Sequence, residues 1–167
     1  MTISCCSIEP VNDEDESVET ESEFSSQRCK NCGGQGRPVS RKTVLLMVKP
    51  DFLEQAMTGT YSFCSARDCP VVYFEEEGRH SFSTDDLRTP VGVKTILDPI
   101  PLCYCFGFDV SDARAEIAAT GRCLIPQRIS ALIKQGMCAC PARNPSGACC
   151  LGEVNRSVQR LLTETSN

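Results

Sequence analysis

The thiol groups carry the clearest chemistry in this sequence, because 13 of its 167 residues are cysteines. Two cysteine pairs lie in the first half of the chain, Cys29-x2-Cys32 and Cys64-x4-Cys69. A structural zinc ion takes four tetrahedral ligands, commonly all cysteines, and each pair must lie on a tight loop that turns both sulfurs toward one point. The spacing therefore predicts one zinc site formed by Cys29, Cys32, Cys64 and Cys69. Free thiols and a redox-active C-x-x-C motif are the alternatives, although no βαβ pattern surrounds the first pair.

Six more thiols, grouped in three close pairs, fall within 48 residues and predict a second metal centre. A C-x-C motif places two sulfurs on one side of an extended loop, where both can ligate one iron, so the partner pair must come from later cysteines. An iron–sulfur cluster takes four thiolates, which leaves two of the six spare. A helix beginning near Cys149 would direct free backbone N–H groups and its dipole at an anionic cluster. The six thiols occur as Cys103-x-Cys105, Cys138-x-Cys140 and Cys149-Cys150.

The composition favours a reducing compartment, which we expect to be the cytoplasm. No signal peptide is recognised at the N-terminus. No apolar run approaches the roughly 20 residues needed to span a bilayer, so membrane insertion is not expected. The odd number of cysteines argues against a fully paired disulfide framework. In a reducing compartment, thiols serve metal binding or redox chemistry more often than disulfides.

The net charge of −5 is concentrated near the N-terminus. Residues 9–23 hold eight of the 22 acidic residues and no base, so the rest of the chain carries 17 bases against 14 acids. Residues 7–27 contain too few apolar groups to offset chain entropy, so we expect residues 1–27 to form a disordered acidic tail. The remaining charges form no basic stripe, which argues against nucleic acid as a partner.

The elements that would position the cysteines predict an α+β fold with two subdomains. Residues 28–98 are expected to form a β-rich, zinc-ribbon-like subdomain. This half contains few large apolar residues, so we expect its metal to supply folding energy and chelation to unfold it first. The sequence patterns predict a short helix at 51–56 and strands at 44–48, 61–63, 71–74 and 91–93.

Residues 99–167 are expected to form a helical subdomain with three helices. The first helix is capped by Asp109 or Ser111 and ends near residue 120, where a glycine follows. The second begins with Pro126, a residue that suits the first turn of a helix, and runs to about residue 134. The third begins near Cys149.

Five short runs of this sequence are distinctive: residues 61–64 (YSFC), 69–74 (CPVVYF), 86–94 (DLRTPVGVK), 101–108 (PLCYCFGF) and 144–151 (NPSGACCL). Together they resemble the N-terminal iron–sulfur domain of CopZ-type copper chaperones. The resemblance covers about residues 28–162, and both cysteine sets match in order and context. The helical part also resembles the bacterioferritin-associated ferredoxin fold.

The resemblance implies a [2Fe–2S] cluster and one mononuclear zinc ion. Carried over position by position, the resemblance implies four cluster ligands: Cys103, Cys105, Cys140 and Cys150, with Cys149 as the alternative to Cys150. It implies the same four zinc ligands as the spacing: Cys29, Cys32, Cys64 and Cys69. In chaperones of this type, the cluster domain is expected to reduce Cu(II) to Cu(I). It precedes a small ferredoxin-like domain that carries copper through an M-x-C-x-x-C motif. This sequence contains no such motif, so we expect a standalone form without the carrier domain.

Three functions are consistent with these features. We favour a redox protein, not an enzyme, whose cluster transfers one electron to a partner protein or to a metal ion such as copper. The alternative is a non-redox module that binds Cu(I) or carries a cluster, for which Cys138 and Cys149 offer soft ligands if they are not packed thiols. A third is a zinc-only interaction module. Three other predictions concern single positions. Cys123 is expected to be a small buried residue, and His80 is expected to lie in a surface turn. Cys5-Cys6 is either a metal-capturing pair or a terminus without a function.

Overall fold

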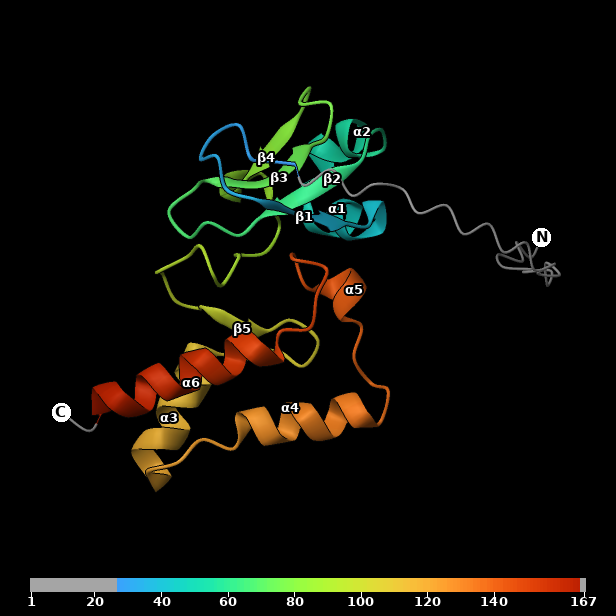
Figure 1. Ribbon diagram of the computed structural model, residues 1–167. Coiled ribbons are helices and arrows are strands. Elements are labelled where there is room, and N and C mark those ends of the chain that lie inside the picture. The colour runs from blue at the N-terminus through green and yellow to red at the C-terminus, as the bar shows by residue number, and fades with distance from the viewer. Residues whose placement is uncertain (1–26, 166–167) are drawn as a thin grey trace, which may run out of the picture.

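The protein folds as two halves joined through residues 88–100, as a computed structural model shows for residues 27–165 (Figure 1). The first half holds an antiparallel sheet with short helices, and the described part of the second half holds a small hairpin and four α-helices. This mixture agrees with the predicted α+β class. Residues 1–26 of the predicted acidic tail lie outside the described residues.

Four antiparallel strands form the sheet of the first half, in the order β1-β2-β3-β4. They are β1 (Gly36–Val39), β2 (Tyr61–Cys64), β3 (Val71–Glu75) and β4 (Ser81–Ser83). The predicted strands on either side of the second cysteine pair are confirmed as β2 and β3. The short helix predicted at 51–56 is confirmed as the 3-10 turn η1 (Pro50–Phe52) followed by α2 (Leu53–Ala56), and a second 3-10 turn, η2 (Thr84–Asp86), follows β4.

The strand predicted at 44–48 is wrong, because this segment lies mostly in helix α1 (Arg41–Met47). Ser40 caps the helix: its hydroxyl accepts a hydrogen bond from the Thr43 N–H at 3.1 Å, which satisfies one of the free N–H groups of the first turn. Thr43, Val44 and Met47 are buried on one side of this helix. A short apolar run is compatible with a buried strand or a buried helix, so its composition alone does not decide between them.

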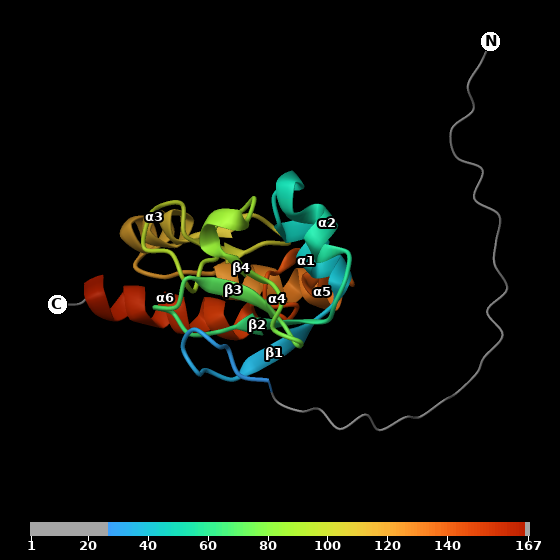
Figure 2. The ribbon, with the colours of Figure 1, turned by 90° about the horizontal axis from the view of Figure 1, so that it is seen from above.

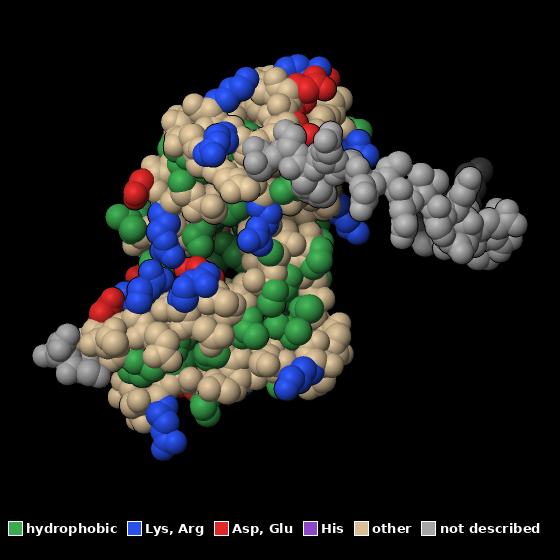
Figure 3. Space-filling view, viewed as in Figure 1, with side chains coloured by type: hydrophobic (Ala, Val, Ile, Leu, Met, Phe, Trp, Pro, Cys, Tyr) green, Lys and Arg blue, Asp and Glu red, His purple; other side chains and the backbone are tan. Residues whose placement is uncertain are grey.

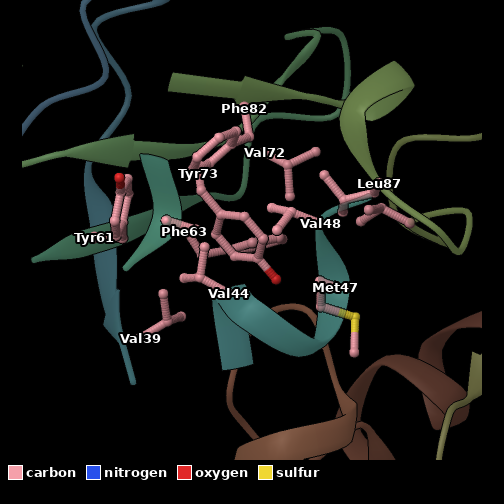
Figure 4. Close-up of a cluster of buried hydrophobic side chains, with 12 residues drawn as sticks. Val39, Val44, Met47, Val48, Tyr61, Phe63, Val72, Tyr73, Phe82 and Leu87 are labelled. Carbon is pink, nitrogen blue, oxygen red and sulfur yellow. The ribbon is translucent and has the colours of Figure 1, made fainter. Parts of the chain in front are cut away.

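The sheet and α1 enclose an apolar core, although the sequence predicted too few large apolar residues for one. Figure 4 shows side chains from the sheet and from α1 pointing toward one another. Tyr61, Tyr73 and Phe82 are almost fully buried, and the Tyr61 and Phe82 rings lie 5.4 Å apart between centroids. Such aromatic burial stabilises the half independently of its thiols. The core therefore reduces the share of folding energy that the metal must supply.

The second half begins with a hairpin and continues with helices. Its elements are β5 (Pro101–Cys103), β6 (Phe108–Asp109), α3 (Val110–Thr120), α4 (Ile125–Lys134), α5 (Cys140–Arg143) and α6 (Leu151–Thr165). The three predicted helices are confirmed as α3, α4 and α6, whereas the hairpin and α5 were not predicted. Asp109 caps α3 by accepting from the Asp112 N–H at 3.0 Å. Gly121 ends α3 in the left-handed region at φ 70°, where glycine has no steric cost.

The two halves contact each other where α5 lies beside α1 (Figures 1 and 2). The buried hydroxyl of Tyr73 donates to the Pro145 carbonyl at 2.8 Å, and the Thr43 hydroxyl donates to the Pro141 carbonyl. Both carbonyls belong to the segment that carries the last four cysteines. The first half therefore supports the backbone that positions those thiols.

Among residues 27–165, no helix combines the length and apolar character needed to cross a membrane.

Candidate metal centres

The first cysteine set converges on a single point. The sulfurs of Cys29, Cys32, Cys64 and Cys69 all lie within 4.8 Å of one another. The Cys32–Cys64 Sγ distance is 3.6 Å and the Cys29–Cys69 Sγ distance is 4.0 Å. Four sulfurs bound tetrahedrally at about 2.3 Å from a zinc ion are about 3.8 Å apart. The spacing of the thiols therefore fits a mononuclear four-thiolate site.

Local backbone structure places these thiols. The Gly33 N–H donates to the Cys29 carbonyl at 2.7 Å, which closes the tight loop that carries both Cys29 and Cys32. Cys64 ends β2 opposite Gly36 of β1, so the first cysteine loop and the end of β2 lie together. Phe74 packs against Cys29, Cys64 and Cys69 to form a small buried cluster. The site is therefore shielded from water on the side that faces the sheet.

The protonation of these thiols reflects their surroundings. Burial raises the pKa of Cys64 to about 12 and also raises the pKa of Cys29. Burial opposes ionisation of Cys69 as well, but the Asn31 amide donates to its sulfur at 3.2 Å. This bond, with the Val71 N–H, lowers the pKa of Cys69 to about 7. Cys29 and Cys64 are therefore protonated at neutral pH until a metal ion displaces their protons.

The second cysteine set forms two pairs. The Cys105 and Cys140 sulfurs lie 3.6 Å apart, and the Ala139 N–H donates to the Cys105 sulfur at 3.3 Å. The Cys103 and Cys150 thiols share a hydrogen bond. The C-x-C motif was expected to supply two ligands to one iron, but each of its sulfurs is paired with a distant cysteine. The hairpin between β5 and β6 directs the two sulfurs of the motif to different partners.

Hydrogen bonding within this set favours the deprotonated form of Cys103. The hydrogen bond from Cys150 lowers the pKa of Cys103 to about 6, and the pKa of Cys150 is raised in turn. Burial raises the pKa of Cys140 to about 12, although the backbone N–H of Cys150 donates to its sulfur. That N–H immediately precedes α6, in agreement with the predicted role of this helix terminus.

The spare thiols occupy different positions. Cys149 is exposed but close enough to affect the ionisation of Cys140 and Cys150. Cys138 is half-buried. Cys123 is buried in the second apolar core, as predicted, and lies 3.7 Å from the Glu116 carboxylate.

Comparison with known proteins gives a consistent result. A family model for a CopZ-type zinc binding domain matches residues 26–88, which contain the whole first cysteine set. The solved N-terminal domain of CopZ from Archaeoglobus fulgidus is 31% identical, with a TM-score of 0.64 over 78% of this chain and 96% of that one. The chain belongs to the CopZ N-terminal domain family. The likeness to that domain covers more of the chain than the zinc binding domain alone.

A curated relative extends beyond the part that matches. The copper chaperone CopZ of Archaeoglobus fulgidus is 32% identical over 143 residues, which cover 77% of this chain. The chain spans 60% of the length of that relative.

A short segment links the two centres of this CopZ-type domain, and sequence reasoning missed its role. Residues 91–93 were predicted as a strand, but they form a turn in which the Lys94 N–H donates to the Val91 carbonyl at 2.8 Å. The Lys94 ammonium group donates to the carbonyls of Ala66 and Cys69, at 2.6 and 3.0 Å. Lys94 therefore holds the loop that carries the second cysteine pair of the first set.

The same turn reaches the second cysteine set. The Gly92 N–H donates to the hydroxyl of Tyr104, between Cys103 and Cys105, at 2.8 Å. A Cβ at position 92 would lie 2.0 Å from the Pro101 carbonyl oxygen, so only glycine allows this close approach. The residues that make this contact with the second cysteine set belong to the run at 86–94. That run contributes to the family resemblance, but its sequence pattern alone did not predict the contact.

We expect zinc affinity to rise steeply with pH. Because burial raises the pKa of both Cys29 and Cys64, their protons must leave when zinc binds. Two released protons correspond to a gain of roughly 100-fold in affinity per pH unit. Below the Cys69 pKa of about 7, a third proton steepens the dependence. Competition with a chelator of known proton affinity measures this slope, and a flat profile would contradict the assigned protonation states.

We expect the change Lys94→Met to accelerate zinc release about tenfold, because outer contacts that orient metal ligands commonly contribute 10- to 100-fold in affinity. Methionine retains the hydrocarbon stem but loses the bonds to the Ala66 and Cys69 carbonyls. Transfer of zinc to a chromophoric chelator gives the rate. The matched control is Lys134→Met, at an exposed position in the last turn of α4. Equal rates for both variants would show that Lys94 does not support the site.

Proposed function

We propose that this chain is a metal-binding module that serves copper handling, with a zinc ion in the first half and a second thiolate centre in the other. The observation that carries this proposal is the convergence of thiols from distant segments, because Cys105 and Cys140 lie 3.6 Å apart across 35 positions of sequence. Two adjacent thiolates repel each other and are costly to bury unless a cation neutralises them, so such a pair is suited to share a metal. The relative named as a copper chaperone supports copper as the metal that is handled.

We assign the zinc ion to Cys29, Cys32, Cys64 and Cys69. Zinc has no redox chemistry and prefers four tetrahedral ligands in structural sites. In this role the ion holds the first cysteine loop against the end of β2.

The second set fits a [2Fe–2S] cluster, which takes four cysteine thiolates. The donors would be Cys103, Cys105, Cys140 and Cys150, because they form two pairs of sulfurs. A cluster of this kind supplies one-electron transfer when it is bound. The N–H groups of Ala139 and Cys150 donate to sulfurs of the set. Such bonds stabilise negative charge and raise the reduction potential. We propose, with this assignment, that the helical half adopts a bacterioferritin-associated ferredoxin-like arrangement.

A second candidate function is a Cu(I) carrier, and the exposure of Cys149 beside two buried thiols favours it. Soft thiolates select Cu(I), and the sulfurs of Cys140 and Cys150 are near Cys149. In this function the protein would exchange its ion with a partner protein through the exposed thiol. No electron transfer is then required.

Metal analysis of anaerobically purified protein tests these functions together. The cluster assignment expects one zinc and two irons per chain, with an electron paramagnetic resonance signal on reduction. Zinc alone, after anaerobic reconstitution with iron and sulfide, would overturn the cluster. Titration with Cu(I) against a competing chelator then measures the carrier function. A Cys149→Ser variant should weaken Cu(I) binding by at least about tenfold if that thiol is a ligand.

A further inference from the structure

A cleft of about 600 Å³ lies between the two halves of the protein. Figure 3 shows a hollow at this level, with apolar side chains inside it and basic side chains at its rim. The first half contributes Arg37, Phe63 and Arg67 to its walls, and the second half contributes Glu153 and Arg156. Small-molecule sites in proteins commonly measure 300–1,000 Å³. The cleft is therefore large enough for a small organic ligand.

The charged lining of the cleft is predominantly basic. Its four charged residues are Arg37, Arg67, Arg156 and Glu153, so three guanidinium groups face one carboxylate. Glu153 accepts from Arg67 at 2.7 Å through one oxygen and from Arg156 at 2.7 Å through the other. Among residues 27–165, Arg37 has no side-chain hydrogen bond or ion pair. The Glu153 carboxylate neutralises one of the three guanidinium charges, so the cleft keeps a net charge of +2.

We propose that this cleft binds a small dicarboxylate anion through Arg37, Arg67 and Arg156. A guanidinium group is planar, always charged and matched in shape to a carboxylate. Two acid groups on the ligand would neutralise the two unbalanced charges. Phe63, Val91 and Leu102 also line the cleft and provide an apolar surface for the carbon skeleton of the ligand.

This site is separate from the first thiol set and shares a wall with the second one, because Cys149 and Cys150 both line the cleft. Of these two thiols, Cys150 is buried and Cys149 is exposed. A bound dicarboxylate would therefore lie next to this thiol and cover it. The site is built by the packing of the two halves and does not depend on which metal the second thiol set holds.

Calorimetric titration of the anaerobically purified protein tests the site directly. The probes are succinate, a simple dicarboxylate, and S-methylglutathione, a peptide dicarboxylate whose methylated sulfur cannot form a thiolate. We expect saturable binding of one molecule per chain, weakened by added salt because the contacts are charged. The probe that binds more tightly identifies the source of the ligand. Absence of saturable binding by both probes would overturn the proposal, whatever metals the protein contains.

Two substitutions of opposite effect locate the binding. Arg37→Gln removes a charged donor and should weaken binding about tenfold. Glu153→Gln removes the competing carboxylate charge and should strengthen binding several-fold. The matched control is Arg122→Gln, at an exposed position after α3 and outside the cleft. Circular dichroism confirms that each variant is folded. Equal affinities for wild type and Arg37→Gln would overturn the site.

Alkylation provides an independent readout. The bound probe should slow the reaction of Cys149 with iodoacetamide, as followed by mass spectrometry of the peptide. Cys138 is half-buried and does not line the cleft, so its reaction should not change. Protection of both cysteines, or of neither, would contradict binding in the cleft.

Discussion

The change Cys64→Ser is expected to abolish stoichiometric zinc binding. Cys64 is fully buried, and its sulfur lies 3.6 Å from that of Cys32. A serine hydroxyl is a poor ligand for zinc, which prefers thiolate, imidazole or carboxylate. The remaining three thiols would hold the ion with an affinity lowered by at least about 100-fold. Metal analysis after dialysis against a mild chelator measures the loss.

This variant also separates the contribution of zinc from that of the apolar core. The core around Tyr61, Tyr73 and Phe82 contains no cysteine. We therefore expect the variant to keep its sheet, with a thermal midpoint lowered by at least ~5 °C. The control is Cys123→Ser, which changes a buried thiol that belongs to neither set. Retention of one zinc per chain by Cys64→Ser, or loss of zinc from the control, would refute the ligand assignment.

With the proposed [2Fe–2S] cluster bound, the change Cys105→Ser is expected to remove the iron and the visible colour of the second centre while zinc remains. The Cys105 sulfur lies 3.6 Å from Cys140 and accepts from the Ala139 N–H. Its loss leaves one thiol of that pair without its partner, so a four-thiolate cluster cannot be completed. Iron and zinc contents and the absorption spectrum of anaerobic protein give the result.

The matched control for this experiment is Cys138→Ser. Cys138 lies two residues before Cys140, in the same loop, but it is only half-buried. We expect this control to retain iron and zinc at wild-type levels. If Cys105→Ser kept its iron, or if Cys138→Ser lost it, the assignment of the four cluster ligands would be wrong.

Local patterns in the sequence were sufficient for several elements. The predicted ends of α3 follow from Asp109 and Gly121, whose side-chain and backbone preferences act within one turn. Strands β2 and β3 were also recognised, from short segments of aromatic and β-branched residues on either side of the second cysteine pair. The same signals were ambiguous for residues 44–48, where the hydroxyl of Ser40 and the burial of one face favour a helix.

The sequence by itself determined the chemistry of this protein: thirteen thiols in closely spaced groups, which select soft metal ions. Only the tertiary structure decided which thiols meet, because Cys105 approaches Cys140 and Cys103 approaches Cys150 through contacts between segments far apart in the chain. The cleft between the halves likewise depends on how α5 packs against α1. Residue type and short spacing act locally, whereas these long-range contacts arise from burial of surfaces that no local pattern encodes.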